Sequence, residues 1–146
     1  MREIKFRGRR TYDKKWIYGN LVIDEGKYKH IVPFDKFIEY GHHLEYDNET
    51  GEPVFFDEET IGQYIGLCDD TDEKNNLYSG DIISYENPNL DEMYTGVIKY
   101  NEEWCCFAIF DKYTDKYEHE SDWKKIKNIK KIGNIFDNPE LLMEEK

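Results

Sequence analysis

Residues 96–110 read GVIKYNEEWCCFAIF, and this stretch decides the fold class. Two runs rich in aromatic and β-branched residues, 96–100 and 104–110, flank Asn101-Glu102-Glu103. Three polar residues between two such runs have the length of a compact hairpin connection. The stretch therefore predicts a pair of antiparallel strands.

The same pattern recurs outward from this pair. Short apolar runs alternate with turn formers, and helical periodicity is nearly absent. The turn from Asp24 to Lys27 joins two of the runs into another hairpin. Further strands are expected at 4–7, 16–23, 28–32, 60–65, 82–85 and 131–136. The chain is therefore predicted to be mainly β, with short antiparallel strands.

One turn can be predicted in more detail. Gly80 and Asp81 precede the apolar pair Ile82-Ile83. We expect Gly80 to take a positive φ and the Asp81 carboxylate to accept backbone N–H bonds as the strand starts. Asp81 is therefore interpreted as structural rather than catalytic.

Length and composition predict a folded chain. The 146 residues include 3 Trp, 12 Tyr and 8 Phe. Each ring removes roughly 150–250 Å² from water when buried, which argues against disorder. A chain of this length bounds one compact domain, 1–146, with a single core.

Two segments depart from the strand pattern. The acidic stretch 34–59 is interpreted as an insertion or loop region, with room for one extra hairpin around residues 48–51. Near the end, Asn138 as N-cap and Pro139 at the first helical position predict a short C-terminal helix over 138–144. Such a short helix needs support, so Leu141 and Leu142 should pack against this domain or another subunit.

Charge is unevenly distributed along the chain. The net charge of −12 divides into +5 over residues 1–30, −19 over 31–123 and +2 over 124–146. Nonspecific duplex nucleic acid binding is not expected, because phosphate neutralisation needs clustered Lys and Arg. The acidic middle either complements the basic ends within one fold or forms a face for a basic partner.

Hydropathy and cysteine spacing predict a cytoplasmic protein with no membrane contact. No stretch approaches the roughly 20 apolar residues of a membrane span, and residues 1–7 have no signal-peptide run. Cys68, Cys105 and Cys106 are odd in number and show no CxxC spacing. A reducing compartment fits this pattern.

Motif spacing predicts no catalytic residue, no metal ligand and no cofactor. No serine lies in a G-x-S-x-G elbow. His42-His43, with Glu39 and Glu45 nearby, is interpreted as a solvated loop because neighbouring side chains of an extended chain diverge. The run 69–73 lacks the Gly and the final Glu of an EF-hand, so it is interpreted as a solvated turn or a weak cation site.

The remaining signal is the number of aromatic rings. Arg7, Arg9 and Arg10 lie near the expected strand that begins at Trp16. Rings and guanidinium groups together can stack a nucleobase and hold a phosphate. The alternative is that the rings build the core of a small β domain.

Five ordered blocks show a family resemblance that spans nearly the whole chain. The blocks are 2–8 (REIKFRG), 16–19 (WIYG), 61–67 (IGQYIGL), 77–83 (LYSGDII) and 132–142 (IGNIFDNPELL). With these blocks the chain resembles the YopX family of phage and prophage proteins. It departs from the family pattern at Ser79, where the family has Glu, and at 70–76, which has no Gly, so a role for that Glu is not carried over.

The resemblance implies a mostly β fold with sandwich and barrel character. It also implies a phage or prophage origin and expression in the cytoplasm of a bacterial host. It implies no catalytic activity.

We therefore expect a non-enzymatic accessory protein that binds a host factor and interferes with host regulation or defence. A homo-oligomer is expected from the short edge strands and the terminal Leu-Leu pair. Two alternatives stay open: sequestration of a small nucleotide signal, and a hydrolase or nuclease with a carboxylate-bound metal. Family blocks and interaction-capable side chains coincide at the candidate ligand-binding residues Arg7, Trp16, Tyr18, Gln63, Tyr64, Tyr78 and Asp81.

Overall fold

The computed structural model describes residues 3–24, 28–34, 55–87, 92–112, 123 and 126–143. Over these residues the chain is mainly β, as the sequence predicts, and its strands pair antiparallel. The chain divides into two compact units, Met1–Tyr64 and Ile65–Lys146, and each is described by itself. The assignment of residues 1–146 to a single domain stays a prediction.

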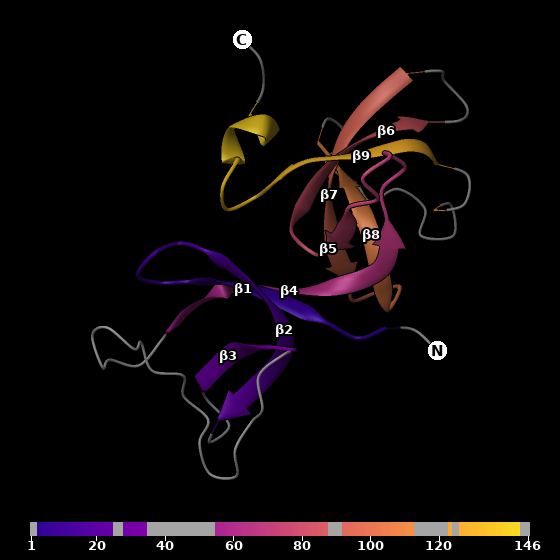
Figure 1. Ribbon diagram of the computed structural model, residues 1–146. Helices are drawn as coiled ribbons and strands as arrows, with labels where there is room; N and C mark the ends of the chain where they lie inside the picture. The colour runs from indigo at the N-terminus through magenta and orange to yellow at the C-terminus, as the bar shows by residue number, and fades with distance from the viewer. Residues whose placement is uncertain are drawn as a thin grey trace. The chain divides into compact units, whose positions relative to one another are not determined.

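The first unit is built on a bent sheet (Figure 1). Its strands are β1 (Phe6–Arg10), β2 (Trp16–Asp24), β3 (Tyr28–Pro33) and the first part of β4 (Phe56–Cys68). They lie in the order β3-β2-β1-β4, and β5 (Asn76–Tyr78) follows β4 where that strand continues into the second unit. The predicted hairpin of β2 and β3 is confirmed by its register, which pairs Leu21 with Ile31.

A small core shows how strongly this first sheet bends. In a flat sheet, β3 and β4 would be about 14 Å apart, three spacings of roughly 4.8 Å. Instead Ile31 of β3 and Phe56 of β4 form one buried cluster. Both side chains lie over Gly8, where an added Cβ would be 3.0 Å from Ile31 and 3.2 Å from Phe56. Gly8 therefore lets the sheet curl, which gives this unit the expected barrel character.

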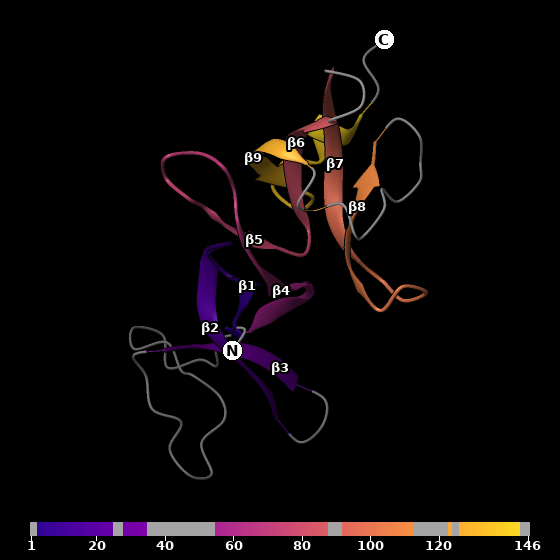
Figure 2. The ribbon, with the colours of Figure 1, turned by 90° about the vertical axis from the view of Figure 1, so that its right-hand side faces the viewer.

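The second unit contains a four-stranded sheet in the order β8-β7-β6-β9, seen side by side in Figure 2. The strands are β6 (Asp81–Asn87), β7 (Glu92–Asn101), β8 (Cys106–Asp111) and β9 (Lys127–Asn134). Residues 102–105 form the turn between β7 and β8. The predicted hairpin is thus confirmed, with its second strand starting at Cys106 rather than at 104 because Cys105 takes a positive φ of 54°.

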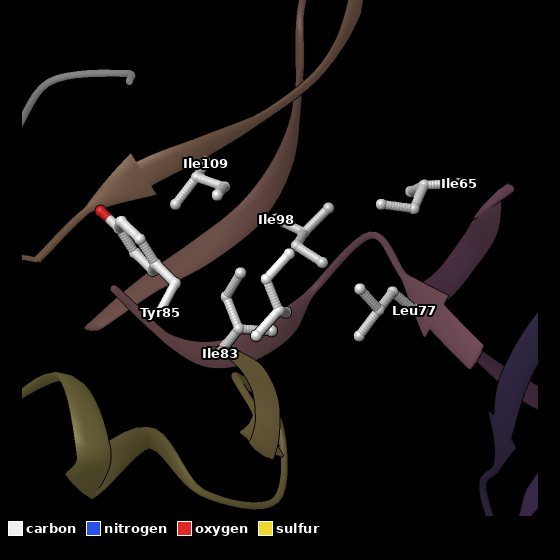
Figure 3. Close-up of a cluster of buried hydrophobic side chains, with 7 residues drawn as sticks. Ile65, Leu77, Ile83, Tyr85, Ile98 and Ile109 are labelled. Carbon is white, nitrogen blue, oxygen red and sulfur yellow. The ribbon is translucent and has the colours of Figure 1, made fainter. Parts of the chain in front are cut away.

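A larger core covers one face of this sheet. Figure 3 shows Ile83 and Tyr85 of β6 directed toward Ile98 and Ile109 of the neighbouring strands. Ile65, from the end of β4, and Leu77 of β5 belong to the same cluster, so two layers enclose it in the manner of a sandwich. The expectation of a single core is therefore corrected, because each unit has a hydrophobic cluster of its own.

The boundaries of two irregular segments are also corrected. The loop expected over 34–59 ends earlier, because β4 begins at Phe56, and residues 35–54, with the hairpin expected at 48–51, lie outside the described part. At the C-terminus the short helix is a 3-10 turn, Pro139–Leu142. Its Asn138 makes no side-chain cap bond and instead accepts a hydrogen bond from the N–H of Asn134 at 3.3 Å.

Candidate functional site

Strand register places several predicted residues on one face of the first sheet. Arg7 of β1 is opposite Tyr18 of β2, and Arg9 is opposite Trp16. Paired residues of antiparallel strands share a face, and alternate residues along a strand return to it. Tyr28 shares this face through its partner Asp24, which is six residues beyond Tyr18. We call the side that carries these five residues, Arg7, Arg9, Trp16, Tyr18 and Tyr28, the aromatic face.

Arg7 is the anchor of this face. Its side chain is 1% exposed, and its guanidinium carbon lies 4.7 Å from the centre of the Trp16 ring. Arg9 lies 6.0 Å from the same ring. A planar guanidinium over an indole is held by cation–π attraction and stacking together, which fixes the ring on the sheet.

The neighbouring cations contact carboxylates. Asp57 of β4 accepts a hydrogen bond from the Lys14 ammonium at 3.1 Å and lies 3.7 Å from the Arg9 guanidinium. The Lys14 hydrogen bond lowers the pKa of Asp57, further helped by the charges of Lys14 and Arg9, against a smaller effect of burial. Arg10 pairs in the same way with Asp13. Burial alone would raise the pKa of Asp13, but the Arg10 bond and nearby charges outweigh it, so the pKa is lowered.

These pairs bear on the phosphate-holding alternative. Of the three arginines that suggested it, Arg9 and Arg10 face carboxylates. A phosphate at either guanidinium would have to displace a carboxylate or lie beside it. The face is therefore electrostatically more balanced than the sequence alone indicates.

Exposed rings occupy the outer part of the aromatic face. Tyr18 and Tyr28 are each 44% exposed, and Trp16 is half-buried. Six residues of an extended strand span about 20 Å, so the two tyrosines lie far apart along β2 and its partner. A surface of this reach suits a protein-sized contact better than a single base.

The two predicted β4 residues are on opposite faces. Tyr64 is buried and lies beneath the Lys5 ammonium, 4.3 Å from its ring centre, and its N–H donates to the Lys5 carbonyl at 2.9 Å. Gln63 pairs with Phe6, which packs against the core cluster of Ile31 and Phe56. Gln63 is therefore on the core side of the sheet, away from the aromatic face.

Tyr78 and Asp81 belong to the second unit and form the predicted turn. The Asp81 carboxylate accepts the Tyr78 N–H at 2.8 Å, and Gly80 has a φ of 93°, which confirms both expectations. Asp81 is fully buried, and the Lys131 ammonium of β9 lies 3.2 Å from its Oδ2 and 5.8 Å from the Tyr78 ring centre. Through these contacts, Lys131 connects the β5–β6 turn to β9.

The acidic run 69–73 forms a turn in which Asp70, Asp72 and Glu73 are exposed, as the sequence predicts, but Asp69 is buried. Asp69 is 3% exposed and accepts hydrogen bonds from Thr71, from Asn75 and from the N–H of Lys131. Burial by itself would raise its pKa, but these bonds outweigh burial and the pKa is lowered. The burial of Asp69 was not predicted because strand periodicity carries no information on which distant backbone amides a carboxylate will meet.

Two residues of these arrangements were missed at the sequence level. Tyr28 could have been predicted from the hairpin turn at 24–27, which places it opposite residue 24 of β2. Even-numbered positions of β2 lie on the same face as Trp16 and Tyr18, so Tyr28 lies on that face too. Lys131 carries no local signal, because its role depends on the pairing of β9 with β6.

Metal-ligand clusters and membrane-spanning helices are both absent from the described residues. Within the described ranges, no three His, Cys, Asp or Glu side chains gather closely enough to hold a metal ion. The histidine pair at 42–43 falls outside those ranges. In the described part of the chain, no helix has the length and apolar character needed to cross a bilayer.

Comparisons with known proteins give a family and a fold. A family model described as "YopX protein" matches residues 5–143. The crystal structure of protein EF1440 from Enterococcus faecalis is similar over 98% of this chain and 100% of that one, with 23% identity and a TM-score of 0.54. No curated protein matches. The structural likeness concerns the fold alone.

Proposed function

Since this chain belongs to the YopX family, we propose that it is a phage or prophage accessory protein that binds a host factor in the bacterial cytoplasm. In this role it converts no substrate and interferes with host regulation or defence through binding. The observation that carries the proposal is the aromatic face, where rings are exposed on the paired strands β2 and β3.

Energetics favour this face as a contact surface. Tyr, Trp and Arg are the residues that most often dominate protein interfaces, because they bury large areas with few rotatable bonds. Tyr18 and Tyr28 are 44% exposed, whereas the local core is made by Ile31 and Phe56 with their neighbours. Rings that keep this much exposed surface can bury further apolar area against a partner, so a contribution to binding is expected.

Charge indicates the character of the partner. On the aromatic face Arg7 is buried against Trp16, and Arg9 lies 3.7 Å from Asp57, so the charges of this face are largely compensated. A host protein with an apolar centre and a polar rim would match this face.

One observation favours a nucleotide as a second candidate. Arg7 and Arg9 both lie against Trp16, so a ring and two cations are close together on one sheet. Calorimetry with a panel of cyclic nucleotides separates the candidates. Saturable heat that is lost in Trp16→Leu supports a nucleotide, and the absence of heat and of any thermal shift discards it.

The decisive test compares two variants in host cells. A tagged chain with Tyr18→Ser and Tyr28→Ser is compared with wild type and with Tyr100→Ser, whose ring is 51% exposed in the second unit. Loss of hot-spot contacts is expected to reduce the captured partner, measured by quantitative mass spectrometry, by at least about tenfold in the double variant. Tyr100→Ser should capture as wild type does, and equal loss in both would remove the proposal.

The remaining expectations have tests of their own. A homo-oligomer is expected to appear by size-exclusion chromatography with light scattering, and a monomer from micromolar concentration upward would exclude it. A metal-dependent hydrolase would be favoured by thermal stabilisation with Mg²⁺ or Mn²⁺ that EDTA reverses. Unchanged stability together with no turnover counts against that alternative.

A further inference from the structure

β9 is an outer strand of the four-stranded sheet, and its outward backbone groups are occupied by the acidic turn. The N–H of Ile129 donates to the Asp70 carboxylate at 2.8 Å, and the N–H of Lys131 donates to the Asp69 carboxylate at 3.2 Å. In return the Asp70 N–H donates to the Ile129 carbonyl at 2.8 Å. The turn therefore lies along β9 as a short pseudo-strand, in which carboxylates replace two of the usual carbonyl acceptors.

The pseudo-strand is stabilised from within. Asp69 accepts the Asn75 N–H at 2.9 Å and the Thr71 hydroxyl at 2.7 Å, and the Asp69 N–H donates to the Asn75 carbonyl at 2.9 Å. The side-chain amide of Asn75 adds a bond to the same carboxylate at 3.1 Å. These bonds close the turn on itself, so its shape does not depend on its contacts with β9 alone.

Charge along β9 is complementary to the turn. Lys127 and Lys130 are exposed on this strand, whereas the Lys131 ammonium is directed to the buried Asp81 carboxylate. The turn brings Asp69 and Asp70 to that edge, and Asp72, Glu73 and Lys74 follow in the same exposed turn. The outer edge of β9 is thus already occupied by an acidic, extended segment of the chain.

We propose that the outer edge of β9 is a strand-addition surface for an acidic, extended segment of a partner protein, and that the turn 69–75 is the internal segment that occupies it at rest. Strand addition supplies affinity through backbone bonds, and the lysines select for acidic sequences. A tethered segment competes at an effective concentration on the order of millimolar, so the partner must offer more ladder bonds than the turn does. This surface is separate from the aromatic face and does not depend on it.

The turn also explains how the chain avoids unwanted pairing. An open edge strand pairs readily with other strands, and proteins commonly block such edges with charge. With the turn in place, the edge offers neither the Ile129 nor the Lys131 amide to a second copy. Oligomers of the resting chain should therefore form through another surface.

Hydrogen exchange combined with a synthetic peptide tests the proposal. The probes are an acidic peptide with the sequence of residues 68–76 and a neutral version with Asn at each acidic position. In wild type, the amides of Ile129 and Lys131 are expected to exchange slowly. In the variant with Asp69→Ala and Asp70→Ala, they should exchange at least about tenfold faster while the core of β6 and β7 stays protected. The acidic peptide should restore protection in this variant, and the neutral peptide should not.

Three controls keep the outcome decisive. Asp72→Ala and Glu73→Ala remove exposed charges from the same turn and should leave both amides protected. Asp70→Ala alone serves if the double variant loses its core protection, and it should speed exchange at Ile129 alone. Fast exchange of both amides in wild type, or a folded variant that gains no protection from millimolar acidic peptide, would overturn the proposal.

Discussion

The two units of this chain place their charged groups differently. In the first, Arg7 and Arg9 lie against Trp16, and the carboxylates that meet cations, Asp13 and Asp57, are at the surface. In the second, carboxylates are buried and accept hydrogen bonds: Asp69 from its turn, Asp81 from Tyr78 and Asp111 from the Tyr85 hydroxyl at 2.9 Å.

This difference separates structural motifs from functional ones. The family blocks of the second unit are explained by the turns that they build, since Asp81 fixes the β5–β6 turn and Asn138 accepts a bond that holds the turn after β9. In the first unit, Tyr18 and Tyr28 keep 44% of their surface exposed on the face that also carries Arg7 and Trp16. The first unit is therefore the better place to look for recognition.

The largest expected effect is on the stability of the second unit. Asp81→Ala leaves the Lys131 ammonium without its carboxylate and the Tyr78 N–H without its acceptor. Removing one partner of a buried pair typically costs about 3 kcal/mol of unfolding free energy. Urea unfolding followed by near-UV circular dichroism measures this loss. Asp72→Ala, an exposed acid nearby, should change stability little, and equal values for both variants would contradict the structural role.

A smaller effect is expected from a conservative change in the first unit. Arg7→Lys keeps the charge but loses the planar group that lies over Trp16. Loss of stacking and of a fitted buried side chain should cost about 1–2 kcal/mol. Lys29→Ala, at an exposed position of β3, is the matched control. If Arg7→Lys were as stable as the control, the cation would not be the anchor of the aromatic face.

Acid should loosen the edge of β9. The pKa of Asp69 is lowered from its ordinary value of 3.8, so the ionised form is favoured by the folded state. Its contribution to stability is complete well above pH 3.8 and is lost as the pH falls through the lowered value. The protection of the Ile129 and Lys131 amides against exchange, relative to their intrinsic rates at each pH, should therefore fall in acid before that of the buried strand β7. Protection that falls equally in both strands would indicate global unfolding instead.

The smallest expected effect is a gain in stability at the turn between β7 and β8. Cys105 has a positive φ of 54° in the turn between β7 and β8, a conformation that costs a residue with a Cβ. Cys105→Gly removes this strain and is expected to raise stability by about 0.5–1 kcal/mol, less the added entropy of the unfolded chain. Thermal unfolding checks the sign, and a loss of stability would show that the thiol packs more favourably than its exposure indicates.

Local chemistry was sufficient to predict much of the fold. Period-2 alternation and turn residues located the β2–β3 and β7–β8 hairpins, and the Gly80-Asp81 turn was confirmed down to its acceptor. The ends of strands were less accurate. β4 begins at Phe56, earlier than predicted. Its acidic residues are held by distant groups, Asp57 by the Lys14 ammonium and Glu58 by the Lys29 N–H, and no local sequence pattern reveals these contacts.

The candidate site was predictable only in part. Arg7, Trp16 and Tyr18 come together because β1 and β2 are adjacent in sequence and their register follows from alternation. Gln63 falls on the other side of the same sheet, and Tyr78 and Asp81 belong to the second unit. Their separation follows from long-range pairing and from the division of the core, neither of which is encoded in any single segment.

Photocrosslinking in host cells tests the central claim most directly. A benzoylphenylalanine residue replaces Tyr18 in one variant and Tyr100 in the other, and adducts are resolved by mass after irradiation. A discrete adduct from position 18, absent from position 100, is the predicted result. Adducts of equal yield at both positions, or at position 100 alone, would contradict the assignment of recognition to the aromatic face.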